Sequence, residues 1–291
     1  MGKHAYCILA HNEPALFRWL IELLDDPRND IFVHIDKRAD ITPFKQVYCK
    51  YSNLVFIQDR IACNWGSLNI VKAELALFEE VVSNGKYDFC HLISGVDMPI
   101  KDQDTIHGYF DRYPGKNFIG FQPRHNESED ERTKYFHLRV YRPGGNLWMR
   151  TCNLFDRISV KVQRKLGIRV RYPFQLYKGA QWVSLSPGFL EWLIEQKVFF
   201  LRCFRFAFIP DERFVQSAFM ASPFVSTHYL PDGEEYDQCM REIDWVRGKP
   251  YTWKEEDSDT LFQSRRMFAR KFSSEHLGIA EMIYKRLKKD A

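Results

Sequence analysis

The first hundred residues alternate short apolar runs with longer stretches that have the period of a helix. The apolar runs are AYCILA (5–10), IFVHID (31–36), LVFI (54–57) and YDFCHLIS (87–94). Between them, PALFRWLIELL (14–24) and the stretch from Gly66 to Asn84 place apolar side chains three and four residues apart. Buried strands that alternate with amphipathic helices favour a mostly parallel sheet with helices on both faces. The sequence therefore predicts an α/β fold.

Each predicted strand is followed by residues that could bind a ligand. These are Ala10-His11-Asn12, Asp36-Lys37-Arg38, Asp59-Arg60 and Ser94-Gly95-Val96-Asp97. Ligands of parallel sheets bind beyond the carboxyl ends of the strands, so we expect these four loops to meet at one rim. A carboxylate such as Asp36 could accept paired hydrogen bonds from a ribose or a uracil. The alternative to this binding role is that Asp36 is a solvated acid beside Lys37 and Arg38.

The composition argues against several classes of protein. A chain of 291 residues with 45% apolar content can bury a large core. The net charge of +4 arises from interspersed charges and does not indicate nucleic acid binding. Seven scattered cysteines without a CxxC pair favour reduced thiols over a disulfide framework or a zinc cluster. No apolar stretch is long enough for a membrane span or a signal sequence, so we expect a cytoplasmic protein.

The second half of the chain is less regular. Residues 124–145 are polar and charged, and they predict a long surface excursion. Strands are expected at WVSLS (182–186), RFAFI (205–209) and FVSTHYL (224–230), with a helix from Pro187 to about Val198. A final helix from His276 to Asp290 has one apolar face and a basic end. It either packs against the core or contacts anionic lipid.

The chain contains no Walker loop, GxGxxG, HExxH or GxSxG sequence, so the motifs of several large enzyme classes are absent. Asp97 is a single acid, which is a poor anchor for Mg²⁺ or Mn²⁺. Asp257-Ser258-Asp259 fits a two-carboxylate metal motif but looks like a helix start. Without a metal, a leaving diphosphate needs cationic side chains. The candidates, which could equally form an ordinary basic surface, are Arg241, Arg265, Arg266, Arg270 and Lys271.

The segment FIPDERFVQSAF places two adjacent acids, Asp211 and Glu212, directly after Pro210. Proline at the first position and acids in the first turn are typical of a helix start. The same position at a strand end suits a general base, since a base must point a carboxylate toward the substrate. The pattern alone does not choose between the two acids.

Seven segments in order resemble one glycosyltransferase family, the core-2/I-branching β-1,6-N-acetylglucosaminyltransferases with the peptide O-xylosyltransferases. They are FVHIDKRAD, NWGSLNIVKAEL, YDFCHLISGVDMPIK, GAQWVSLS, PDERFVQSAF, REIDW and FARKF. With the AYCILA strand, the matches run from about residue 5 to residue 272. The resemblance implies a GT-A type fold and an inverting transfer from a UDP-sugar that needs no divalent metal. It also implies one domain, with a nucleotide-binding half (1–122), an acceptor-binding and catalytic half (123–272) and a C-terminal helix (273–291).

The resemblance also implies roles for single residues. Glu212 is similar to the family's catalytic base, and Asp211 would be its structural neighbour. Arg241 and Lys271 are similar to the pair that neutralises the diphosphate, and Asp36 to the nucleoside-binding acid. Further candidates for the UDP site are Ala10, Arg60 and Asp97. Weaker candidates for the acceptor site are Glu127, Lys134 and Trp182, of which Trp182 could equally belong to the core.

The expected donor is UDP-N-acetylglucosamine or else UDP-xylose, and the expected acceptor is a glycan or a lipid-linked glycan. No nucleic acid partner and no metal cofactor are expected. The family's animal members are anchored Golgi proteins with several disulfides, a pattern that this chain lacks. We therefore expect a bacterial, cytoplasmic relative whose basic C-terminus could touch the inner face of the membrane. The alternatives are a non-catalytic sugar-binding protein and a nucleotide-dependent enzyme of another α/β family.

Overall fold

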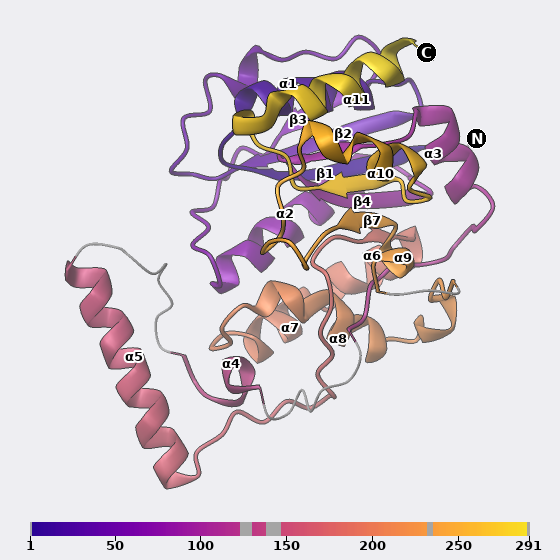
Figure 1. Ribbon diagram of the computed structural model, residues 1–291. Helices are drawn as coiled ribbons and strands as arrows, with labels where there is room; N and C mark the ends of the chain where they lie inside the picture. The colour runs from indigo at the N-terminus through magenta and orange to yellow at the C-terminus, as the bar shows by residue number, and fades with distance from the viewer. Residues whose placement is uncertain (1, 123–129, 138–146, 232–234, 290–291) are drawn as a thin grey trace.

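A five-stranded sheet runs through the centre of the protein, whose computed structural model describes residues 2–122, 130–137, 147–231 and 235–289 (Figure 1). The strand order is β3-β2-β1-β4-β6. The strands are β1 (His4–Ala10), β2 (Asn29–Ile35), β3 (Asn53–Phe56), β4 (Phe89–Ser94) and β6 (Ser184–Leu185). The first four are parallel, and β6 is antiparallel to β4. The predicted α/β fold with a mostly parallel sheet is confirmed.

Helices cover both faces of the sheet. Because successive side chains of a strand point to opposite faces, Ala5 and Cys7 of β1 join one core and Tyr6 and Ile8 join the other. The first core packs against α2 (Leu68–Asn84), α6 (Pro187–Glu195), α7 (Lys197–Cys203) and α8 (Phe214–Met220). The second core packs against α1 (Pro14–Leu24) and α3 (Gln103–Phe110).

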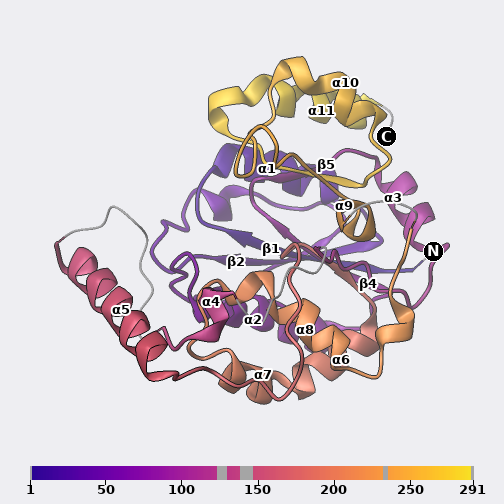
Figure 2. The same cartoon turned by 60° about the horizontal axis from the view of Figure 1, so that its bottom comes forward.

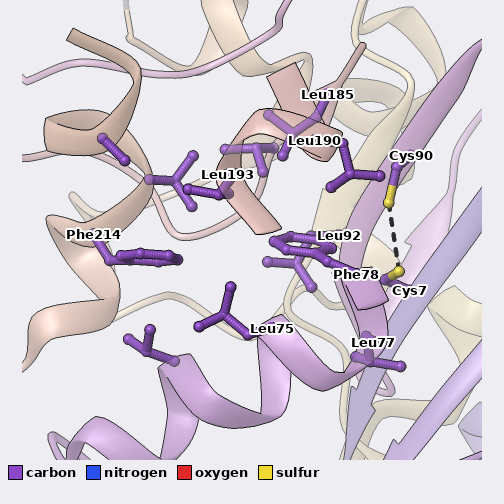
Figure 3. Close-up of a cluster of buried hydrophobic side chains, with 14 of the residues drawn as sticks. Cys7, Leu75, Leu77, Phe78, Cys90, Leu92, Leu185, Leu190, Leu193 and Phe214 are labelled. Carbon is purple, nitrogen blue, oxygen red and sulfur yellow. Dashed lines mark hydrogen bonds between the residues drawn. The ribbon is translucent and has the colours of Figure 1, made fainter. Parts of the chain in front are cut away.

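The first core fills the space between α2 and the sheet (Figure 3). Leu75 and Phe78 of α2 belong to the same buried cluster as Leu92 of β4. Each such fully buried side chain contributes about 1.5–3 kcal/mol of transfer free energy. Cys7 and Cys90 lie in the same cluster with their sulfur atoms 3.4 Å apart, and all seven cysteines are free thiols.

A second sheet of three short strands was not predicted. Its order is β5-β8-β7, with β5 (Asp97–Pro99), β7 (Arg241–Ile243) and β8 (Phe268–Arg270). Three residues are too few to show a period of two, so the sequence pattern contains no signal for them. Helices α9 (Glu235–Cys239) and α10 (Ser258–Gln263) lie next to these strands in the chain.

The C-terminal helix α11 (Leu277–Lys289) packs against α1. Its Ile279, Ala280 and Ile283 are buried in a cluster with Leu16 of α1 and Trp253. Of the two alternatives that the sequence left open, the structure favours the packed helix. The apolar face of α11 is therefore not available to lipid.

Two predicted strands are wrong. RFAFI (205–209) is irregular, because Phe206 and Phe208 pack against other aromatic rings and Ile209 has a left-handed backbone with φ 54°. FVSTHYL (224–230) contains a 3-10 turn and one bridge between Asn117 and His228. The predicted helix from Pro187 is also divided into α6 and α7. Short 3-10 turns cover Phe44–Gln46, Pro210–Glu212, Val225–Thr227, Glu255–Asp257 and Ser274–His276.

Residues 130–137 of the predicted surface excursion (124–145) are described, and they contain the short helix α4 (Glu131–Lys134). The long helix α5 (Leu147–Leu166) follows the excursion. Helix α5 stands apart from the body of the molecule in both views (Figures 1 and 2). None of the described helices is both long and apolar enough to cross a membrane.

Candidate active site

The loops that follow the parallel strands meet at one rim, as expected. The Asp36 N–H donates to the Ala10 carbonyl at 2.9 Å, and the Gly95 N–H donates to the Leu9 carbonyl at 2.9 Å. Arg60, beyond β3, donates from Nη1 to the Asp36 carbonyl at 3.3 Å. Residues that are far apart in sequence are thus held together by hydrogen bonds at the carboxyl end of the sheet.

The Asp36 carboxylate is held by its neighbours. Arg38 donates to it from Nε and Nη2, at 3.1 and 2.9 Å, and the Cys63 N–H donates at 3.0 Å. Burial acts to raise the pKa of Asp36, but these hydrogen bonds outweigh it and hold the pKa below its usual range. A nucleoside would have to share this carboxylate with Arg38. Its predicted role in nucleoside binding stays a prediction.

Asp97 closes the turn after β4. It accepts hydrogen bonds from the Ser94 N–H and hydroxyl, both at 2.8 Å, and from Arg270 Nη1 at 2.7 Å. The Arg270 guanidinium carbon lies 4.3 Å from the centroid of the Trp182 ring, a cation–π contact. Trp182 is buried in the core, which is one of its two predicted alternatives. It therefore supports Arg270 from within the fold.

Lys271 and Arg241 occupy different environments. The Phe272 N–H donates to the Val96 carbonyl at 2.9 Å, which places the half-buried Lys271 beside the loop after β4. Arg241 is only 2% exposed, and burial lowers its pKa to about 10. Its guanidinium donates to Ser184 Oγ at 3.1 Å and to the Val183 carbonyl at 2.8 Å. Their predicted contacts with a diphosphate are untested.

The segment with the two acids begins at a strained residue. Ile209 has a positive φ, which is rare for a β-branched side chain and costs free energy. Its N–H donates to the carbonyl of Gly66 at 2.9 Å. The expected helix start is a separate 3-10 turn, η3 (Pro210–Glu212), because Arg213 with φ −137° interrupts the helical backbone before α8. This corrects the prediction of one continuous helix.

The two acids of η3 differ in exposure. The Glu212 side chain is 33% exposed, with Arg132 Nη1 at 3.4 Å and Lys178 Nζ at 3.6 Å from its carboxylate. Asp211 is 8% exposed, and its Oδ1 has no hydrogen-bond partner within the described part of the chain. Burial, assisted by the charge of Glu212, raises the pKa of Asp211 to about 7. Glu212 can therefore reach a substrate, whereas Asp211 lies inside the protein.

A third acid, Glu74 of α2, is fully buried close to Asp211. It accepts a hydrogen bond of 2.6 Å from Gln181 Nε2. Burial, and then the charge of Asp211, raise the pKa of Glu74 well above its usual value. Sequence reasoning missed this residue. The sequence did contain a signal that Glu74 is buried. Glu74 lies three residues after Val71 and one before Leu75, on the apolar side of the helix.

A comparison with protein families identifies the family of the chain. Residues 4–261 match the family model of the core-2/I-branching enzymes. The chain belongs to the core-2/I-branching enzyme family. The matched range contains Asp36, Asp97, Glu212 and Arg241, and it ends before Lys271.

Individual relatives of this core-2/I-branching family member are distant. It is 23% identical to the xylosyltransferase oxt of Drosophila melanogaster, over 87% of this chain and 30% of that protein. It is 22% identical to the human N-acetyllactosaminide beta-1,6-N-acetylglucosaminyl-transferase, over 72% of this chain and 50% of that protein. The chain thus spans half or less of the length of these relatives. Mouse xyloside xylosyltransferase 1 in its apo form aligns with 92% of this chain and 96% of its own, at 11% identity and a TM-score of 0.38.

The acceptor candidates of this family member are not brought together in the described residues. Glu127 lies outside them. Lys134 is half-buried at the end of α4, with Nζ 6.0 Å from the centroid of the Tyr135 ring. Arg132 of the same helix contacts Glu212, with its Nη1 3.4 Å from the carboxylate.

The two-carboxylate motif at Asp257 begins a helix, as expected. Asp257 pairs with Arg247 at 2.6 Å and accepts the Lys254 N–H at 3.0 Å, directly before α10. Across residues 2–122, 130–137, 147–231 and 235–289, no three His, Cys, Asp or Glu side chains are grouped so that they could hold a metal ion. The predicted metal independence stays a prediction.

Proposed function

We propose that this core-2/I-branching family member is an inverting glycosyltransferase of GT-A type. It moves a sugar from a UDP-sugar to a hydroxyl of a glycan acceptor in the cytoplasm. The observation that carries the proposal is the unequal burial of two adjacent acids, because only Glu212 of the pair is exposed beside cationic groups. The names of the relatives suggest N-acetylglucosamine or xylose as the donor sugar.

In the proposed reaction, the acceptor oxygen attacks the anomeric carbon while the bond from that carbon to the diphosphate oxygen breaks. Glu212 takes the proton of the acceptor hydroxyl. Lys271, at the loop after β4, neutralises part of the charge on the departing UDP. Arg241 acts as a positioning residue, since its buried guanidinium links Leu92 of β4 to Val183 and Ser184 at the start of β6.

We expect the two cations to differ in their mutant phenotypes. Lys271→Ala should weaken UDP binding at least several-fold and leave the melting temperature nearly unchanged. Arg241→Ala should lower the free energy of unfolding by roughly 1–3 kcal/mol, because it removes the hydrogen bonds that the guanidinium donates to the buried carbonyl groups of Cys239 and Leu92. Calorimetry with UDP and thermal unfolding measure both effects. Unchanged UDP affinity in Lys271→Ala would remove this residue from the site.

A ligand screen tests the proposed function itself. UDP, UDP-N-acetylglucosamine, UDP-xylose and UDP-galactose are added to the protein with and without Mn²⁺, and the melting temperature is measured. A ligand at 100 times its Kd stabilises the folded state by roughly 2.7 kcal/mol. We expect UDP and one UDP-sugar to stabilise the protein in the presence of EDTA. A separate assay of sugar transfer tests the metal independence. Transfer activity that disappears with EDTA and returns with Mn²⁺ contradicts it.

The competing function is a non-catalytic sugar-binding protein with the same fold. It predicts stabilisation by a sugar or a UDP-sugar without release of UDP. Measuring free UDP in the presence of donor and an acceptor mixture separates the two functions, because only an enzyme releases UDP continuously.

A further inference from the structure

One face of helix α5 exposes several large apolar side chains. The side chains of Phe155 and Leu166 are 68% and 65% exposed. The members of this exposed face are Leu147, Leu154, Phe155, Ile158, Val162 and Leu166. Their spacing of three, four and seven residues places them on one side of the helix. Large apolar side chains gathered on one exposed face usually mark an interaction site.

The opposite face of α5 is fixed to the protein. Asp156 bonds to Nδ1 of His137 at 2.8 Å, and Gln163 exchanges two hydrogen bonds with the backbone of Phe136, at 2.8 and 2.9 Å. Cys152 and Val160 are buried on the same side. Because the polar contacts hold this side, the exposed apolar face points away from the protein.

The charge around this face has one sign. Residues 147–171 contain seven basic residues and one acidic residue, Asp156, which the hydrogen bond to His137 already engages. The basic residues are Arg150, Arg157, Lys161, Arg164, Lys165, Arg169 and Arg171. A helix with an apolar face, basic flanks and too little hydrophobicity to span a bilayer is typical of helices that lie in a membrane interface.

We propose that α5 docks the protein on an anionic membrane surface, with Phe155 and its apolar neighbours inserted at the boundary of the headgroups. Charge complementarity favours this occupant over a second copy of the chain. A symmetric dimer through this face would bring two basic helices together, and like charges at such an interface oppose association. Anionic lipid supplies the opposite charge.

The docked helix lies next to the candidate active site. Arg164 of α5 pairs with Glu131 of α4, and Arg132 of α4 contacts Glu212 at 3.4 Å. The N-terminus, where β1 begins, lies on the side away from α5 in both views, so the carboxyl ends of the parallel strands point toward α5 (Figures 1 and 2). Membrane docking would thus bring Glu212 close to a lipid-linked acceptor. This last step rests on the proposed function, whereas the docking itself does not.

Vesicle sedimentation tests the docking independently of any transfer activity. The full chain is mixed, at low and at high salt, with vesicles of phosphatidylcholine alone or with vesicles that also contain phosphatidylglycerol. A phosphatidylglycerol fraction of ~40% gives a strongly anionic surface. We expect binding to the anionic vesicles only, and weaker binding at high salt because ions screen the attraction. Lys161→Gln with Lys165→Gln should weaken binding roughly 25-fold, at about fivefold for each charge. Phe155→Ser with Ile158→Ser should weaken it by at least about tenfold.

The matched control removes two charges from the other basic helix, by Lys285→Gln with Lys288→Gln in α11. This variant should bind like the unaltered chain, since its charges lie on a helix whose apolar face is buried. Absence of binding to anionic vesicles, or equal binding by the α5 variants, would overturn the proposal. It would also be overturned if sedimentation velocity without vesicles showed a dimer that Phe155→Ser with Ile158→Ser converts to a monomer.

Discussion

Replacing Glu212 with glutamine is expected to lower the rate of sugar transfer by about 10²–10⁴-fold, the usual contribution of a general base. Glutamine keeps the shape of the side chain and can still accept a hydrogen bond from Arg132, but it cannot take a proton. The loss should appear in kcat and kcat/KM together, because the proton moves only in the transition state. UDP affinity should stay within about twofold, a difference of roughly 0.4 kcal/mol.

The melting temperature of this variant should also be nearly unchanged. Glu212 is one-third exposed, and its contacts to Arg132 and Lys178 are long, at 3.4 and 3.6 Å. Such ion pairs typically contribute less than about 1 kcal/mol. The matched control is Asp211→Asn, which alters the neighbouring acid and should keep most of the activity near pH 7. Near-normal turnover in Glu212→Gln together with an inactive Asp211→Asn would reverse the assignment of the base.

Asp211→Asn is expected to stabilise the folded protein at pH 8 and to change little at pH 4. Burial and the charge of Glu212 raise the pKa of Asp211 to about 7 in the folded state, against an ordinary value of 3.8. The folded state therefore holds this proton more tightly than the unfolded state does. As the pH rises from about 4 to about 7, the unfolded chain releases the proton first, and the free energy of unfolding falls.

The size of this effect follows from the difference in pKa. About three pKa units at 1.36 kcal/mol each give a loss of roughly 4 kcal/mol by pH 8, as an order of magnitude. Asparagine cannot ionise and avoids this loss. Urea unfolding of the two proteins at pH 4, 6 and 8 measures it, and comparing the proteins at each pH cancels the contribution of the buried histidines His4, His91 and His107. Equal pH dependence of both proteins would show that Asp211 does not titrate in this way.

Asp36→Asn serves as a control of opposite sign. The pKa of Asp36 is held low by hydrogen bonds from Arg38 and Cys63, which outweigh its burial. Its contribution to stability is therefore present above the unfolded pKa and is lost as the pH falls through the folded pKa. We expect Asp36→Asn to destabilise the protein at pH 8 and to have a smaller effect at low pH, the reverse of Asp211→Asn.

The elements that the sequence predicted well are long and periodic. Helix α1 begins at Pro14 and ends at Leu24, as its apolar spacing predicted, and each of the first four strands lies within two residues of its predicted bounds. The failures are aromatic segments such as RFAFI (205–209). There Phe206 and Phe208 pack against the rings of Phe136 and Trp65, which are distant in sequence, and the segment is not part of a sheet. Helix α5 was missed although its apolar residues recur at helical spacing in the sequence, and only the structure shows that this apolar face is exposed.

The sequence by itself determined the α/β architecture, the rim of loops beyond the parallel strands and the order of motifs that resemble one family. These properties depend on local period and on neighbouring residues, both of which are readable along the chain. The resemblance pointed to Glu212 as the base, but only the tertiary structure gave a physical difference between the two acids: Asp211 is buried near Glu74, and Glu212 is one-third exposed beside Arg132. The tertiary structure likewise placed Arg241 inside the protein and Lys271 at the rim. Burial and charge are properties of the surrounding space, and that space exists only after the chain has folded.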